Sequence, residues 1–142
     1  MSKKYKVGYT TGVFDLFHIG HLNILKRAKE QCEYLIVGVS TDELVQAYKH
    51  KKPVIPFEER MAIVNAIKYV DKTVAQTSMD KIAAWEKLRF DALFHGDDWA
   101  NTKMYNDIQN ELKKHNVEMV FLPHTAGVSS TMILNKMRSA ND

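Results

Sequence analysis

The chain reads KVGYTTGVFDLFHIGH over residues 6–21, and this stretch decides the fold. Its first half is rich in β-branched and aromatic residues, which favour a strand, and that strand runs into Gly12. Gly12 allows a tight turn, and a helix is expected to begin near Gly20. In an open parallel sheet, ligands bind where strands end and the next helices begin. The sequence therefore predicts a binding site in this first turn.

Two histidines, His18 and His21, stand three residues apart at the predicted helix start. This spacing puts both on one helix face, where they could contact the same phosphate, as donors if protonated. Gly20 would let a phosphate approach free backbone N–H groups at the helix start. A solvated helix face, or two ligands of a metal ion, are the alternatives for an arbitrary pair of this kind. Gly12 and Gly20 favour phosphate binding.

Outward from this turn, strand-like apolar runs alternate with apolar residues at helical spacing, which is typical of a parallel sheet covered by helices. None of the runs alternates cleanly, as expected of strands buried on both faces. The expected strands are Lys6–Gly12, Tyr34–Ser40, Lys72–Gln76, Asp91–His95 and Glu118–Leu122. Helical spacing is carried by Leu22, Leu25 and Ala28, by Met61, Val64 and Ile67, by Ile82, Trp85 and Leu88, and by Tyr105, Ile108 and Leu112. A last helix is expected after the cap residue Ser129, to about Met137.

This pattern predicts an α/β fold with a five-stranded parallel sheet and helices on both faces. The 142 residues suffice for one core and are too few for two ordinary domains, so residues 1–142 are expected to form a single domain. A net charge of +3, from 20 basic and 17 acidic residues spread along the chain, gives no support for nucleic acid binding. One cysteine, Cys32, and no apolar run of membrane length predict a cytoplasmic protein without membrane insertion.

Three motifs resemble those of a known family. The first turn resembles the signature of the nucleotidyltransferases related to class I aminoacyl-tRNA synthetases, and residues 18–21 spell their HIGH motif. The stretches GDDW at 96–99 and TAGVSST at 125–131 look like the second and third signatures of the glycerol-3-phosphate cytidylyltransferase branch. The resemblance covers roughly residues 7–137 and implies a Rossmann-like nucleotidyltransferase fold. The chain is far too short to be a synthetase.

The resemblance also implies the nucleotide-binding residues. Asp98 would accept hydrogen bonds from the base and Trp99 would pack over the pocket, although adjacent carboxylates can also be turn or cap residues. Hydroxyls and N–H groups at the start of the last helix suit a triphosphate, although Ser129 can also simply cap the helix. The implied nucleotide-binding residues are Gly12, Val13, Phe14, Asp15, His18, Gly20, His21, Gly96, Asp98, Trp99, His124, Thr125, Ser129 and Ser130.

Lys49 and Lys51 are expected in a loop after the second strand, where two ammonium groups could hold the substrate phosphate and the triphosphate together. Such a basic run is often only a solvated loop. The resemblance favours phosphate binding, because the family has a Lys-x-Lys pair here. Arg60 matches a family arginine and would bind phosphate or a dimer partner. A surface ion pair within its helix is the alternative.

The chain departs from the family pattern at three positions. His124 replaces an arginine, Val13 replaces a threonine, and Lys68 stands where the glycerol-3-phosphate enzymes have arginine. His124 bears most on the identity of the base, so ATP stays an alternative to CTP.

The resemblance implies in-line attack of a substrate phosphate on the α-phosphate of CTP, with His18, His21, Lys49 and Lys51 as the catalytic residues. Mg²⁺ would arrive with the nucleotide, because no cage of carboxylates stands out in the sequence. Glycerol 3-phosphate is the first expected acceptor, as in the synthesis of teichoic-acid-like or capsular polymers. Ribitol, choline and ethanolamine phosphates are alternatives. A homodimer is implied by the resemblance alone. An adenylyltransferase, or a regulatory module that binds nucleotide without catalysis, are the competing functions.

Overall fold

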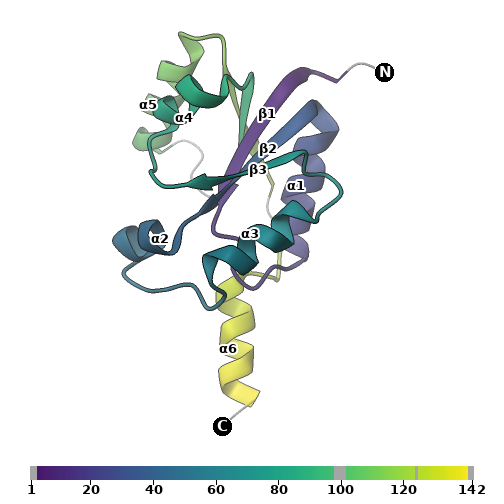
Figure 1. Ribbon diagram of the computed structural model, residues 1–142, viewed down its shortest axis with the longest axis vertical. Coiled ribbons are helices and arrows are strands. Elements are labelled where there is room, and N and C mark those ends of the chain that lie inside the picture. Colours follow the sequence, from purple (N-terminus) through teal and green to yellow (C-terminus); the bar gives the residue numbers. More distant parts are fainter. Residues whose placement is uncertain (1–2, 98–101, 124, 141–142) are drawn as a thin grey trace.

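The computed structural model describes residues 3–97, 102–123 and 125–140. Its centre is a five-stranded sheet with the strand order β3-β2-β1-β4-β5, in which each pair of neighbouring strands is parallel (Figure 1). The α/β fold and the parallel five-stranded sheet that the sequence predicts are therefore confirmed. The strands are β1 (Tyr5–Gly12), β2 (Cys32–Ser40), β3 (Lys72–Gln76), β4 (Ala92–Gly96) and β5 (Glu118–Leu122). The helices are α1 (Ile19–Gln31), α2 (Asp42–Lys49), α3 (Phe57–Asn65), α4 (Lys81–Leu88), α5 (Lys103–Lys113) and α6 (Ser130–Ala140).

The strand boundaries follow the sequence prediction closely, but helix α2 was not predicted. The segment Asp42–Lys49 carries no clear helical spacing of apolar residues, since Val45 is its one buried residue among those described. The Oγ1 of Thr41 accepts the N–H of Leu44 at 3.2 Å and so caps the helix start. Lys49 is therefore the last residue of a helix and not a loop residue, while Lys51 follows the helix.

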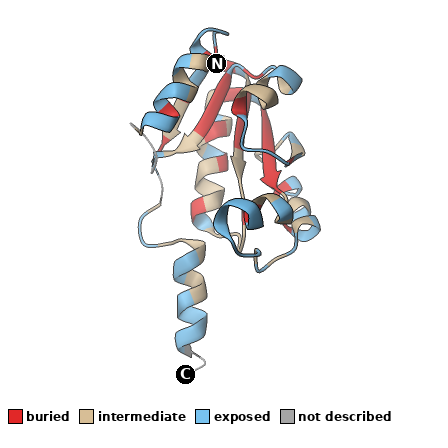
Figure 2. Ribbon diagram, turned by 90° about the vertical axis from the view of Figure 1, so that its left-hand side faces the viewer, coloured by how far each residue is buried: buried red, intermediate tan, exposed pale blue. Residues whose placement is uncertain are grey.

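Two clusters of buried side chains hold the helices against the sheet, one on each face. On one face, Leu25 of α1 and Val64 of α3 pack with Val37 and Val39 of β2. On the other face, Leu112 of α5 packs with strand residues such as Ile36 and Leu93, and α4 adds partly buried apolar side chains. The buried strands appear in red between these helices in Figure 2. The strands are thus covered on both faces, which is why they read as apolar runs without alternation.

The order of the strands fixes the place of a ligand site. From β1 the chain moves outward through β2 to β3, and then returns to β4 on the opposite side of β1. The connections therefore leave the ends of β1 and β4 in different directions, which opens a crevice at the carboxyl edge between them. The first turn, after Gly12, lies at this edge.

Helix α6 projects away from the body of the molecule, and most of its length is exposed (Figures 1 and 2). None of the helices in the described residues is long and apolar enough to cross a membrane.

Candidate active site

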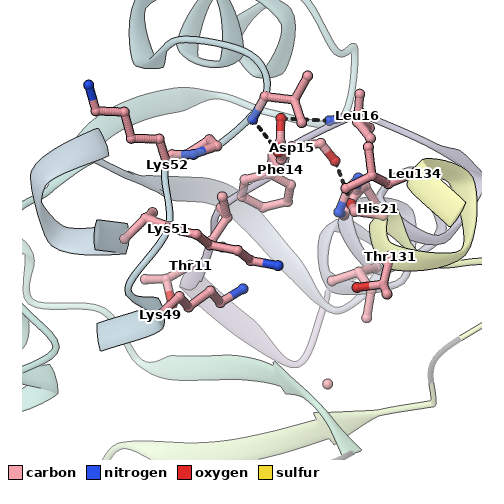
Figure 3. Close-up of a pocket in the computed structure, with 18 of the residues that line it drawn as sticks. Thr11, Phe14, Asp15, Leu16, His21, Lys49, Lys51, Lys52, Thr131 and Leu134 are labelled. Atoms are coloured by element: carbon pink, nitrogen blue, oxygen red, sulfur yellow. Dashed lines mark hydrogen bonds between the residues drawn. The ribbon is translucent and has the colours of Figure 1, made fainter. Parts of the chain in front are cut away.

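A cavity of ≈ 300 Å³ lies at the carboxyl edge of the sheet, where the crevice is expected (Figure 3). Five parts of the chain form its wall: the end of β1 with the first turn, the start of α1, α2 with the basic segment after it, the end of β4, and the start of α6. Of the predicted site residues, it brings together Gly12, Val13, Phe14, Asp15, His21, Lys49, Lys51, Gly96 and Ser130.

The first turn holds strained backbone. Phe14 and Leu16 have positive φ angles of 56° and 49°, which cost residues with a side chain about 1 kcal/mol or more each. The ring of Phe14 is buried and folds over Gly12, where a Cβ would lie only 3.0 Å from it. Its ring centroid is 5.4 Å from that of His21, in an edge-on arrangement. The strained turn therefore places an aromatic wall that fixes the imidazole of His21.

The two histidines cap the helix that they begin. Nδ1 of His18 accepts the N–H of Gly20 at 3.0 Å, and Nδ1 of His21 accepts the N–H of His18 at 3.2 Å. Together these bonds form a capping box at the start of α1. Because each Nδ1 is an acceptor, the proton of each neutral ring must lie on Nε2. The cap thus fixes the tautomer, and both rings have an Nε2–H left to donate.

Both histidines are neutral at ordinary pH. Burial lowers the pKa of His18, and burial together with the charge of His18 lowers the pKa of His21 to about 4. The ring centroids are stacked only 3.9 Å apart, so two imidazolium charges would repel each other strongly. Donation by the two histidines therefore does not require protonated rings, because each neutral ring carries an Nε2–H group.

Gly20 is required for a different reason from the predicted one. A Cβ at this position would lie 2.7 Å from Cε1 and 2.9 Å from Nδ1 of His18. The N–H of Gly20 is not free for an anion, because it donates to that Nδ1. Glycine therefore lets the His18 ring fold back onto the helix start.

Three lysines give the cavity a positive charge. Lys49, Lys51 and Lys52 line it, and Figure 3 shows the ammonium groups of Lys49 and Lys51 pointing into it, whereas that of Lys52 points away. Burial and the nearby charge of Lys51 lower the pKa of Lys49, and the charge of Asp15 partly offsets this effect. A bound anion would relieve the repulsion between the two lysines.

The carboxylate of Asp15 ties the first turn to the segment that follows the lysines. Oδ1 accepts the N–H groups of Leu16 and Ile55 at 3.1 and 2.9 Å, and Oδ2 accepts the N–H of Val54 at 2.8 Å. Both oxygens are thus engaged by backbone. Asp15 lines the cavity as predicted, and its carboxylate holds the cavity wall together.

Arg60 is not the surface ion pair of the alternative interpretation, because its side chain is fully buried. A buried side chain also presents no surface to a dimer partner, and the phosphate contact of Arg60 stays a prediction. It donates to the carbonyl oxygens of Val13, Ser40 and Ile55, and to Oδ1 of Asp42 at 2.6 Å. The residue is placed behind the cavity and joins its walls.

The start of α6 carries hydroxyl groups. Oγ of Ser129 accepts the N–H of Met132 at 3.0 Å and caps the helix, and the hydroxyl of Ser130 donates to the carbonyl of Asp15. The Oγ1 of Thr125 accepts an N–H of Asn23 in α1 at 2.8 Å. These bonds dock the third motif onto the first turn. Thr125 and Ser129 are not among the residues that line the cavity.

Lys81 was missed by the sequence analysis. It opens helix α4 and is only 3% exposed, and its Nζ donates to Oγ1 of Thr11, a cavity residue, at 2.8 Å. Within the described residues no carboxylate pairs with it, and burial lowers its pKa to about 8. No local signal separates it from the many other lysines, because its burial results from the packing of α4 onto the end of β1.

The predicted residues Asp98, Trp99 and His124 lie outside the described residues. In the described ranges, no cluster of three or more His, Cys, Asp or Glu side chains could hold a metal ion. At His18 and His21, each Nδ1 already accepts a backbone N–H, so neither Nδ1 is free to bind a metal ion.

Comparison with known proteins agrees with this geometry. Residues 9–136 match the family model described as cytidylyltransferase-like. The chain is 37% identical over 131 residues to the glycerol-3-phosphate cytidylyltransferase of Bacillus spizizenii, covering 92% of this chain and 95% of that protein. The enzymes of the same name from Bacillus subtilis and Staphylococcus aureus are 36% and 35% identical, and 91% and 92% of their lengths are covered. The matched regions amount to 87% and 90% of this chain.

A solved structure supports the fold. The lipopolysaccharide core biosynthesis protein from Thermoplasma volcanium superposes with a TM-score of 0.71 at 23% identity, covering 85% of this chain and 97% of that one.

Lys81→Met is expected to stabilise the protein. The folded-state pKa of about 8 lies below the ordinary value of 10.5, so the charged form opposes folding at neutral pH. Removing the charge should raise the free energy of unfolding at pH 7 by about 1–3 kcal/mol. The difference from wild type should shrink as the pH rises from 8 toward 10.5, because the wild-type protein then gains stability.

Urea unfolding at pH 7, 8 and 9.5 measures this effect, and Lys87→Met, on the exposed side of the same helix, is the control. A variant less stable than wild type at every pH would mean that the bond to Thr11 outweighs the cost of the buried charge.

Proposed function

The chain belongs to the cytidylyltransferase-like family, and we propose that it transfers the cytidylyl group of CTP to the phosphate of a small alcohol phosphate. Glycerol 3-phosphate is the proposed acceptor, and CDP-glycerol and pyrophosphate are the products. The names of three relatives at 35–37% identity support this choice. The observation that carries the proposal is a cavity with lysine ammonium groups on one wall and a fixed, neutral imidazole on another, stacked against a second.

The proposed reaction is one in-line displacement. An oxygen of the acceptor phosphate attacks the α-phosphorus, a new P–O bond forms, and the bond to the β-phosphate breaks to release pyrophosphate. No covalent intermediate with the protein is needed. The contribution of the protein is therefore to position two anions and to stabilise the charge that develops on the α-phosphate oxygens.

The histidines suit the second task. Each Nε2–H is a donor whose direction is set in advance by the bond at Nδ1, so no reorganisation is needed during the reaction. Because both rings are already neutral, a rise in pH removes no charge from them. Their Nε2–H groups therefore stay donors across this pH range.

The lysines suit the first task. Lys49 and Lys51 point into the cavity, where their charges would bring the acceptor phosphate and the triphosphate together. Ser130, which lines the cavity at the start of α6, would bind the leaving pyrophosphate, and Ser129 would cap the helix behind it.

Mg²⁺ is proposed to enter on the triphosphate. Among the described cavity residues the only carboxylate is Asp15, and both of its oxygens already accept backbone N–H groups. When bound to the triphosphate, the ion supplies neutralisation of oxygen charge. Lys49, Lys51 and the imidazole Nε2–H groups would then stabilise the remaining negative charge on the phosphates.

The direct test is pyrophosphate release by the purified protein, with CTP or ATP crossed against glycerol 3-phosphate, ribitol 5-phosphate, phosphocholine and phosphoethanolamine. We expect Mg²⁺-dependent release with CTP and glycerol 3-phosphate, and loss of activity with EDTA. Release with ATP alone would assign the chain to adenylyl transfer. CTP binding without release in any mixture would identify a regulatory module.

Substitution of either histidine tests the transition-state role. His18→Ala or His21→Ala should lower kcat by about 100-fold or more, as for other preorganised donors. In the wild type, kcat should stay level from pH 7 to 8.5, because the pKa of His21 is about 4 and that of His18 is lowered. Donation by imidazolium would instead make kcat fall as the pH rises through this window. His115→Gln, on an exposed histidine away from the cavity, is the control.

The three lysines offer a matched comparison. Lys49→Met and Lys51→Met should each raise the KM for the acceptor and lower kcat, together reducing kcat/KM by at least about tenfold through the loss of one charge contact to phosphate. Lys52→Met should have little effect, because its ammonium group points away from the cavity. Equal effects at all three positions would indicate only a general field of positive charge.

A further inference from the structure

His95 of β4 stands beside the cavity but is not part of any of the three motifs. It directly precedes Gly96, a cavity residue. Phe94 packs in the core on the α1 face and Leu93 in the core on the α5 face, so the alternation of the strand puts His95 on the α5 side. There its ring meets Tyr105, from the first turn of α5, with ring centroids 4.8 Å apart.

In two hydrogen bonds of His95, the donor and the acceptor can be assigned from the partner atoms. Nδ1 lies 3.1 Å from the carbonyl oxygen of Gly96, and Nε2 lies 2.9 Å from the hydroxyl of Tyr105. A carbonyl oxygen can only accept, so Nδ1 must carry the proton that it donates to Gly96. Nε2 of the neutral ring is then an acceptor, and the hydroxyl of Tyr105 donates to it. The tyrosine therefore fixes the tautomer that lets His95 hold the Gly96 carbonyl.

This pair joins two elements on either side of the connection from β4 to α5. Tyr105 is itself anchored, since it is only 4% exposed and its ring contacts Phe121 of β5. Its N–H also lies 3.4 Å from Oγ1 of the cap residue Thr102. Gly96, in contrast, has open space beside it, because a Cβ there would meet no heavy atom within 4 Å. The backbone of Gly96 is paired with Leu122 of β5 on one side, and its carbonyl oxygen is also held by His95.

We propose that His95 and Tyr105 are a positioning pair for the nucleotide. By fixing the Gly96 carbonyl and the start of α5 relative to each other, they set the β4 wall of the cavity at the distance that CTP requires. The proposal rests on the proposed function and adds to it residues that contact neither the reacting phosphates nor, in the described part of the chain, the cavity itself.

The variants separate the two hydrogen bonds. Tyr105→Phe removes the hydroxyl and keeps the ring, and His95→Leu removes both bonds. His95→Asn has nearly the size of leucine, and its amide N–H can replace the Nδ1–H that donates to Gly96. We expect Tyr105→Phe and His95→Leu to raise the KM for CTP by about three- to tenfold, the range for one lost hydrogen bond, with kcat changed by less than about twofold. His95→Asn should recover part of the affinity.

The double variant His95→Leu/Tyr105→Phe should be no worse than His95→Leu alone, because the two residues act as one unit. Tyr34→Phe, on a half-exposed tyrosine at the start of β2, is the control. Calorimetric titration with CTP measures affinity without an acceptor, and thermal melting reports whether each variant is folded.

The positioning role is overturned if folded Tyr105→Phe and His95→Leu bind CTP as wild type does, or if kcat falls while the KM for CTP stays constant. Additive losses in the double variant would also contradict it. A wild-type chain that neither binds nor turns over CTP would overturn the proposed function and this inference together.

Discussion

The buried guanidinium of Arg60 is the interaction on which the site depends. A charge in the interior is stable only when its donors are satisfied, and this one bonds to carbonyls at the ends of β1 and β2 and to Asp42. The same side chain bonds to Ile55, whose N–H is held by Asp15. The basic segment between α2 and α3 is thus fixed at its carboxyl end from two sides. One arginine that need not contact substrate therefore determines where the cavity lysines can reach.

The distribution of charge in the cavity follows a simple electrostatic logic. The positive charges belong to Lys49, at the end of α2, and to Lys51, which follows it. The stacked imidazoles are kept neutral by burial. Charged histidines at 3.9 Å would destabilise the helix start that they cap. Using the N–H of Gly20 to fix the orientation of the His18 ring removes one backbone donor from the start of α1, and the imidazole Nε2–H groups provide other donors. The histidines therefore act as extensions of the helix start.

The sequence predicted the sheet well, because its strands are local patterns. Strands buried on both faces form apolar runs, and β3 and β5 have the predicted boundaries. The first turn was found from its glycines and paired histidines. The protonation state of the histidines, the burial of Arg60 and Lys81, and the link between His95 and Tyr105 could not be predicted, because each depends on residues far apart in the chain. Helix α2 was missed because its cap, Thr41, precedes a segment with almost no buried face.

Helix α6 connects the cavity wall to a part of the surface that lies away from the body of the molecule. Its first turn lies in the cavity wall through Ser130 and Thr131, while its later turns project from the body (Figure 1). Eleven residues at about 1.5 Å each make an arm of roughly 16 Å. A partner that bound the distal turns would therefore contact the same helix that contributes Ser130 and Thr131 to the cavity wall.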